Sequence, residues 1–382
     1  NGSWEEVFQG PGASELERIL PGYLASRAWF REPLKQIRSA AILDVISLRP
    51  LSRDVDISLL ILEVLFTDAR RQLYFLPVKF TGQGQIPWAE SLAADTVLAR
   101  LEVHQNGLQQ AGLLHDAFGD EQFAELLLKA VSSRRLLKGR HGEVAGRAKR
   151  ALRRLLVEPQ GRSREITMVH ESHRNSAVAY GDRLFFKLFR RLEEGVHPEL
   201  QAGTYLAETM AFPHVAPIAG TIEYRHEGSQ PITVGILEAF VVHKRNAWDL
   251  TRDRLDAFLD AALEDPALQE EVTDEVPRRP IVELAGIEPP EPAWRAFGSH
   301  LRALELLARR SAELHQALSR ETEDSAFAPQ PVTQLHQRSI YQSLRNAWGR
   351  SLRALHYHLP NLSEGARTTA EIVLERRDDV LA

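Results

Sequence analysis

The runs of strand-forming residues in this 382-residue chain all lie within its first 242 positions. Residues 39–116 contain apolar runs such as ISLLILEVLF, and residues 164–242 contain DRLFFKLF and ITVGILEAFVV. Such runs, rich in β-branched and aromatic residues and bounded by polar turns, are typical of strands. Beyond Trp248 the periodicity is helical, interrupted by a Pro-rich acidic loop at 274–292. This order predicts an α+β protein whose strands precede its helices.

The composition is that of a soluble globular protein: 43% of the residues are hydrophobic and 26% are charged. A net charge of −5 and a pI near 6.3 argue against a dedicated nucleic-acid partner. No cysteine is present, which excludes disulfides and thiolate metal sites and fits a cytoplasmic location. No apolar stretch is long enough to span a bilayer, and the start, NGSWEEVFQG, lacks the features of a signal peptide, so no membrane partner is expected.

The first part of the chain predicts a small antiparallel domain. Residues 1–19 are interpreted as a linker running into a short helix that ends at the Pro-Gly of LPGYL. Residues 20–135 are expected to form an N-terminal cap, with a sheet at 39–116 that has its own core. Asn106-Gly107 favours a tight hairpin within this sheet, and Asp120 is a candidate N-cap for the following helix.

Residues 136–160 are interpreted as a connecting segment, which contains the basic stretch KGRHGEVAGRAKRALRRLL. A solvated helix face is the preferred interpretation of this stretch, and a polyanion site is the alternative.

Residues 161–245 predict a second sheet with one helix packed on it. The order is strand, polar turn, strand, a helix from Pro198 and two more strands, as in the small lobe of a kinase-like fold. Lys187 lies in the middle of LFFKLF, and a buried ammonium is costly unless a partner holds it. Such a lysine can neutralise nucleotide phosphates, or it can lie on an edge strand and reach solvent. The strand pattern alone leaves both interpretations open.

A wider segment, VHESHRNSAVAYGDRLFFKLFRRLEEGVHPEL, resembles the nucleotide-binding segment of bacterial maltokinases, relatives of the aminoglycoside phosphotransferases. The matching positions are the turn residues Glu171, Ser172, Asn175 and Ser176, the strand Lys187-Leu188-Phe189-Arg190-Arg191, and the helix start Pro198-Glu199-Leu200. FPHVAPIAGTIEYR is similar to the next segment of that family, and LPGYLASRAWF is similar to the opening of its cap, with Ala28 where Arg is usual. The resemblance covers most of residues 18–320.

This resemblance implies ATP and Mg²⁺ as cofactors and assigns roles to individual residues. Lys187 would hold the phosphates, oriented by Glu199. The expected nucleotide contacts come from two further groups: donors in the turn, Ser172, Asn175 and Ser176, and backbone groups of the hinge, Glu238, Ala239 and Phe240. The alternatives are an ordinary polar hairpin turn and an edge strand leaving the sheet.

The sequence departs from the family at several points. Gln201 stands where the family often has a second acid, and Asn246 stands where it often has Asp. The H-G-D and D-F-E segments that supply the base and the Mg²⁺ ligands are absent, so no catalytic or metal-binding residue is expected within this chain. They are expected beyond residue 382, which makes residues 246–382 an incomplete helical lobe and the chain alone inactive. Other acids and histidines are interpreted as structural or surface residues: Asp54, Asp56, His115, Asp116, His315, His356 and His358.

For the complete enzyme, the resemblance implies phosphorylation of maltose to maltose 1-phosphate for α-glucan and glycogen synthesis. It also implies a link to trehalose metabolism, by association or fusion with trehalose synthase. A non-catalytic kinase-like module that docks a partner enzyme is the alternative, as is a kinase for another small molecule.

Overall fold

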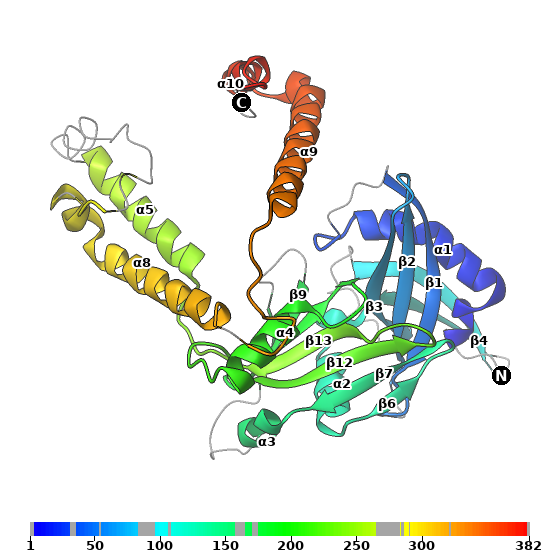
Figure 1. Cartoon of the computed structure of the whole chain (residues 1–382). Coiled ribbons are helices and arrows are strands. Elements are labelled where there is room, and N and C mark those ends of the chain that lie inside the picture. Colours follow the sequence, from blue (N-terminus) through cyan, green and yellow to red (C-terminus); the bar gives the residue numbers. More distant parts are fainter. Residues whose placement is uncertain are drawn as a thin grey trace. The chain divides into compact units, whose positions relative to one another are not determined.

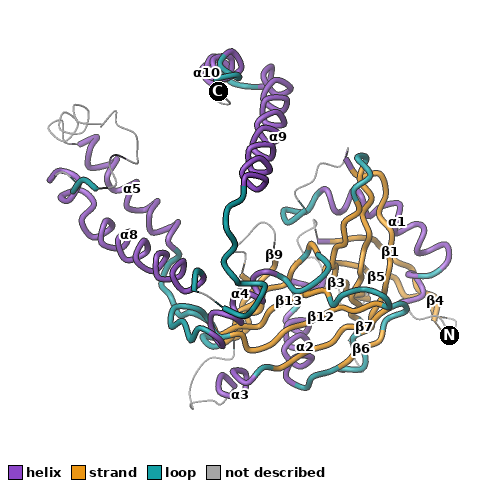
Figure 2. Tube along the Cα trace, in the orientation of Figure 1, coloured by secondary structure: helices purple, strands orange, loops and turns teal. Residues whose placement is uncertain are grey.

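A computed structural model describes residues 4–30, 36–52, 55–82, 96–105, 108–156, 165–169, 175–264, 283, 286–289, 291–320 and 322–379. The chain divides into two compact units, Asn1–Leu314 and His315–Ala382. The first unit contains two antiparallel sheets, with helices before, between and after them (Figures 1 and 2). The predicted α+β class is therefore confirmed.

The first sheet is the one predicted within residues 39–116. Its strands are β1 (Ile37–Ser47), β2 (Ile57–Phe66), β3 (Arg71–Gly82), β4 (Val97–Gln105) and β5 (Leu108–Asp116), in the order β1-β2-β3-β5-β4. Gln105 pairs with Leu108, as the predicted hairpin requires, although Asn106-Gly107 itself lies outside the described residues.

Strand β2 is apolar except at Ser58 and Glu63 because both of its faces are covered. Leu60, Leu62 and Val64 pack into a cluster with helix α1 (Gly10–Ala25). The alternate residues of β2, including Leu59 and Ile61, pack into a second cluster. A strand between two apolar layers has no face left for polar residues.

The second sheet confirms the prediction for residues 164–242 and extends it. Strands β8 (Ile166–Val169), β9 (Asn175–Tyr180), β10 (Leu184–Phe189), β12 (Ile218–His226) and β13 (Ile232–Ala239) are joined by β6 (Leu136–Lys138) and β7 (Gly142–Ala148). The order is β6-β7-β12-β13-β10-β9-β8. Helix α4 (Pro198–Thr204) begins at the predicted proline. The predicted connecting segment 136–160 therefore supplies two strands and helix α3 (Arg150–Leu156).

The two sheets share one core, which corrects the prediction of a cap with a separate core. The second cluster contains Phe75 of β3, Phe123 of α2 (Glu121–Ser132) and Phe186 of β10. Asp120 is the N-cap of α2, as predicted, because its side chain accepts hydrogen bonds from two backbone amides of the first turn. The short strand β11 (Arg191–Leu192) even pairs with β3 of the first sheet. Only the face of the first sheet that meets α1 has a cluster of its own.

The predicted linker at 1–19 is also corrected. A 3₁₀-helix (Trp4–Phe8) precedes α1, and the rings of Trp4 and Phe80 stack with centroids 5.9 Å apart. Helix α1 continues through Pro21 to Ala25 and does not end at the Pro-Gly. Trp4 and Phe8 are buried, so this segment belongs to the core of the first unit.

Beyond the sheets the described residues are helical, as predicted. Helices α5 (Ala247–Glu264) and α8 (Glu291–Leu318) come first, and α9 (Gln334–His358), a short 3₁₀-helix (Leu359–Asn361) and α10 (Glu364–Glu375) follow in the second unit. None of the described helices has the length and hydropathy needed to cross a membrane.

Candidate functional site

Strand β10 places Lys187 on a face of the second sheet that is otherwise mostly apolar. Phe186 and Leu188 point into the core shared by the two sheets. Phe185 and Phe189 point to the opposite face, and Lys187 lies between them because side chains alternate along a strand. Its lateral neighbours are Ala177 of β9 and Ile236 of β13, so Lys187 lies on an inner strand and not at an edge. This placement rules out the edge-strand interpretation.

Two carboxylates hold the Lys187 ammonium. Its Nζ donates a hydrogen bond to Oε1 of Glu199, the partner predicted from the sequence. A second carboxylate oxygen, Oε1 of Glu238, lies 3.1 Å from Nζ. The Lys187 side chain is 27% exposed, and that of Glu238 is 16% exposed. The acid at the start of α4 is therefore the one that pairs with Lys187, and Gln201 is not needed for it.

The start of α4 fixes the position of Glu199. His197 is the N-cap, and its Nδ1 accepts a hydrogen bond from the backbone N–H of Glu199 at 3.2 Å. The imidazole of His197 also stacks on Phe189 with ring centroids 3.8 Å apart. Burial lowers the pKa of His197, which keeps the ring neutral and its Nδ1 able to accept at neutral pH. Pro198 then occupies the first helical turn, where its missing N–H costs nothing.

The electrostatics of this cluster keep Lys187 charged. Burial acts to lower the pKa of Lys187, but the hydrogen bond and charge of Glu199 and the charge of Glu238 outweigh it, so the pKa lies above its ordinary value. An ammonium carries three N–H donors, and two carboxylates use two of them. The ammonium can therefore offer one directed donor to a third acceptor.

A buried apolar cluster adjoins this charged cluster. It contains Ala177, Ala179 and Phe185, which are 5%, 6% and 7% exposed, with Val169 and Phe240 packed against them. The rings of Phe185 and Phe240 lie 6.0 Å apart. The Lys187 ammonium therefore lies beside packed apolar side chains on this face of the sheet.

The described residues of the predicted turn, Asn175 and Ser176, lie on opposite faces of the second sheet. Ser172 and Glu171 lie outside the described residues. Asn175 pairs with Phe189 and so shares the face of Lys187, which is compatible with its predicted role. Ser176 faces the other way, and its hydroxyl accepts a hydrogen bond from Nε of Arg190 at 2.8 Å. The prediction for Ser176 is wrong because strand alternation turns the residue into the interior.

Two backbone amides of the predicted hinge are already bonded within the protein. The backbone N–H of Ala239 donates to the carbonyl of Pro217 at 3.0 Å, and that of Phe240 donates to the carbonyl of Arg183 at 2.8 Å. Neither amide is available to a ligand. Glu238 contributes its side chain to the cluster, a contact that the sequence prediction missed. The sequence did contain a signal for this contact. Glu238 lies two residues after Ile236, and side chains two apart on a strand share a face. Ile236 is the residue of β13 that pairs with Lys187.

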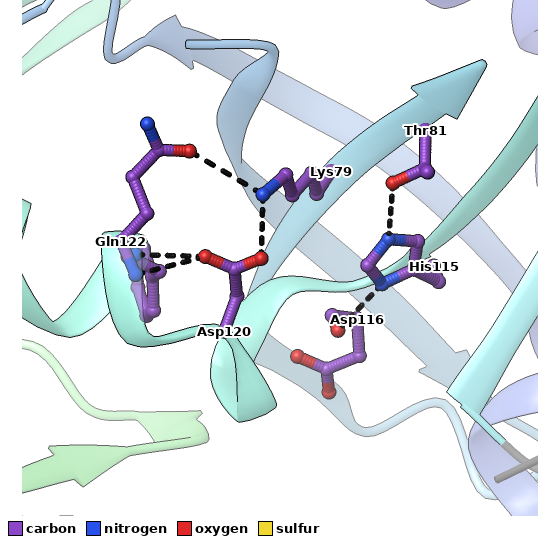
Figure 3. A network of polar contacts seen from close by, with 7 residues as sticks. Lys79, Thr81, His115, Asp116, Asp120 and Gln122 are labelled. Atoms are coloured by element: carbon purple, nitrogen blue, oxygen red, sulfur yellow. Dashed lines mark hydrogen bonds and ion pairs between the residues drawn. The ribbon is translucent and has the colours of Figure 1, made fainter. Parts of the chain in front are cut away.

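A polar network in the first sheet accounts for several of the acids and histidines interpreted as structural (Figure 3). Nε2 of His115 lies 3.0 Å from the Thr81 hydroxyl, and its Nδ1 lies 3.1 Å from the carbonyl of Asp116. The Lys79 ammonium donates to Asp120 at 2.5 Å and to Gln122 at 3.3 Å. These contacts hold strands β3 and β5 and the start of α2 to one another.

Asp56 also has a structural role. Asp56 accepts hydrogen bonds from Trp4 and Arg49, and Asp54 lies outside the described residues. Within the described part of the chain, no group of three histidines or acids could hold a metal ion.

Comparisons with known proteins return weak similarities. No family model matches the chain. A glucosamine kinase in complex with glucosamine, ADP and inorganic phosphate is 14% identical with a TM-score of 0.41, and the match covers 98% of this chain and 64% of that one. Another crystal form of glucosamine kinase is 15% identical with a TM-score of 0.43, covering 90% of this chain and 58% of that one. The chain thus spans less than two thirds of the length of these kinases.

Proposed function

We propose that this chain carries the nucleotide-binding part of an ATP-dependent sugar kinase. The observation that carries the proposal is the ion pair between Lys187, on an inner strand, and Glu199, in the first turn of the following helix. Phosphotransferases of kinase-like build use a strand lysine oriented by a helix acid to neutralise nucleotide phosphates. Here a second carboxylate, that of Glu238, also contacts the Lys187 ammonium.

The residues present fit the phosphates of a nucleotide. The third N–H of Lys187 and its charge suit phosphate oxygens. Asn175, the first residue of β9, and Ser172, outside the described residues, remain candidate phosphate donors. For Mg²⁺ the described residues offer no three-ligand cluster, so no step is derived through the metal.

The acceptor we propose is maltose, which would give maltose 1-phosphate. In this reaction the anomeric hydroxyl oxygen forms a bond to the γ-phosphorus, the bond to the β-phosphate oxygen breaks, and ADP leaves. The hydroxyl proton needs a base, which the sequence does not supply as an H-G-D segment. The maltose assignment and the trehalose synthase partner rest on the sequence resemblance to maltokinases, and the proposed cytoplasmic location rests on the absence of cysteine.

A non-catalytic module is the second candidate, and the missing H-G-D and D-F-E segments favour it. In that case the Lys187 cluster would stabilise α4 on the sheet and bind no nucleotide. The two candidates differ in whether the chain itself binds ATP.

Calorimetric titration of the chain with ATP tests the proposal. We expect saturable binding by the wild type and loss of most of the affinity in Lys187→Ala, with an unchanged circular dichroism spectrum. Lys138→Ala is the matched control because Lys138 is exposed on β6. Absence of ATP binding to the wild type would support the non-catalytic module. ATP consumption with maltose, measured on the full-length product of the gene, then tests the acceptor.

A further inference from the structure

A basic pocket of about 1430 Å³ lies on the second sheet, in addition to the Lys187 cluster. One wall is formed by Arg134, which follows α2, and by Arg150, Arg153 and Arg154 of α3. The other wall is formed by the segment after α4, with Phe212, Val215 and two prolines. The pocket is thus cationic on one side and, apart from Glu208, apolar on the other.

The arginines of this pocket are exposed, and within the described part of the chain none of the four forms a hydrogen bond or ion pair through its side chain. Lys149, which also lines the pocket, differs, because its Nζ is bound to Glu208 at 2.8 Å and to Thr204 at 3.0 Å. That lysine ties the two walls together, while the guanidinium groups remain available.

The position of the basic wall is fixed by packing. Leu152 of α3 is 3% exposed and belongs to the core shared by the two sheets. Anchoring this residue leaves Arg150, Arg153 and Arg154 on the solvent side of the helix. The basic wall therefore belongs to the scaffold of the first unit.

The apolar wall begins at an unusual backbone. The chain leaves α4 through a π-helical turn at Tyr205–Thr209 and then places Ala211 at φ +49°. Each feature is uncommon and costs free energy, and π-turns are frequent at functional sites. These features direct Phe212 and the following residues along the pocket.

The charge of the pocket contrasts with that of the chain. Four guanidinium groups gather here in a protein whose net charge is −5. Arginine pairs with carboxylates through two parallel hydrogen bonds, and it is enriched with aromatic residues at protein interfaces. A cationic field of this kind attracts anionic groups. The apolar wall can contact uncharged groups of the same ligand.

The size and spacing of the walls favour a peptide over a small anion. Small-molecule sites are usually about 300–1,000 Å³, which this pocket exceeds. Arginines one helical turn apart are separated by about 5.4 Å along the axis. Side chains on one face of an extended peptide repeat about every 6.6 Å, and the alternate side chains point to the other face. An extended segment with alternating acids and apolar residues would meet both walls at once.

We propose that this pocket binds an extended segment of another protein in which acidic and apolar residues alternate. The acids pair with the arginines of α3, and the apolar side chains pack on Phe212 and Val215. The alternative of a solvated helix face predicts no such binding.

A labelled octapeptide of alternating glutamate and valine is the probe, with fluorescence anisotropy as the readout on the full chain. We expect Arg150→Glu/Arg153→Glu/Arg154→Glu to weaken binding by at least thirtyfold. The matched control, Arg345→Glu/Arg350→Glu/Arg353→Glu on α9, makes the same charge change on another exposed helix and should leave affinity unchanged. No binding by the wild type, or equal loss in both variants, would overturn the proposal.

The apolar wall and the peptide class are tested separately. Val215→Ser should weaken binding of the alternating peptide about threefold or more and leave the weaker binding of octaglutamate unchanged. If octaglutamate binds the wild type as tightly as the alternating peptide, the apolar wall has no part and the inference is wrong. Stronger binding of inorganic pyrophosphate than of the peptide would equally reject it, in favour of a phosphate site.

Discussion

Arg190 and Asp116 form a buried ion pair between the two sheets, with Nη2 and Oδ2 2.9 Å apart. Their side chains are only 2% and 9% exposed. The guanidinium also donates to Ser176 and lies over the rings of Trp29 and Phe118, each centroid 5.1 Å away. A charge so enclosed depends on its partner, because isolating it in the interior is costly.

Removal of one partner should therefore be strongly destabilising. We expect Asp116→Asn to lower the free energy of unfolding by about 3 kcal/mol, since the Arg190 charge would stay buried without its counter-ion. Urea unfolding followed by tryptophan fluorescence measures this. Asp68→Asn, which removes an exposed ion pair with Arg70, is the control and should leave the midpoint unchanged. Equal midpoints for both variants would refute the stabilising role of the Arg190–Asp116 pair.

Gly139 marks a second contact between the sheets. A Cβ at this position would lie 2.6 Å from Oδ1 of Asp44, which accepts hydrogen bonds from the backbone N–H groups of Val45, Arg140 and His141. Gly139→Ala should thus destabilise the protein by about 1–3 kcal/mol, because the buried carboxylate has to move from its donors. In Gly119→Ala the added Cβ meets open space, and we expect a change within about 0.5 kcal/mol. Thermal unfolding compares the pair, and similar results for both would contradict the prediction.

The buried His115 predicts a pH dependence. Burial lowers the pKa of His115 below its ordinary value of 6.5. The unfolded chain then binds the proton more readily than the folded one, so stability is full above pH 6.5 and falls as the pH drops towards the lower folded pKa. The slope should reach at most about 1.4 kcal/mol per pH unit for one proton. In His115→Gln the slope between about pH 6.5 and pH 5 should be smaller, while exposed His336→Gln should keep it. An unchanged slope in His115→Gln would be evidence against this assignment.

The two acids on Lys187 should act in opposite directions if the site binds nucleotide. Glu199 orients the ammonium, so Glu199→Gln should weaken ADP binding. Glu238 places a second negative charge near the incoming phosphates, so Glu238→Gln should strengthen binding by on the order of tenfold at intermediate effective dielectric. Calorimetric titration measures both, with the exposed Glu227→Gln as control. The same direction of change in both variants would argue against the proposed division of roles.

How far the sequence predicts this protein depends on whether a feature is local or tertiary. The β10 strand and the start of α4 at Pro198 follow from short-range patterns, whereas the Lys187–Glu199 pair was implied by the family resemblance. The prediction for Ser176 failed because the position of this residue depends on strand alternation combined with Arg190 as a partner. The shared core could not be predicted either, since a run such as ISLLILEVLF is equally apolar whether its second face meets a helix or another sheet.

The shared core has a consequence for synthesis on the ribosome. Leu59 of β2 and Phe75 of β3 pack in the same cluster as Leu237 of β13, which is synthesised long after them. At about 5–20 residues per second, the chain between Phe75 and Leu237 takes roughly 10–30 s to emerge. During that interval, the inner face of the first sheet lacks part of its cover. We expect the nascent chain to depend on holding chaperones over this stretch, and chains truncated before β13 to aggregate even though they contain β1 to β5 in full.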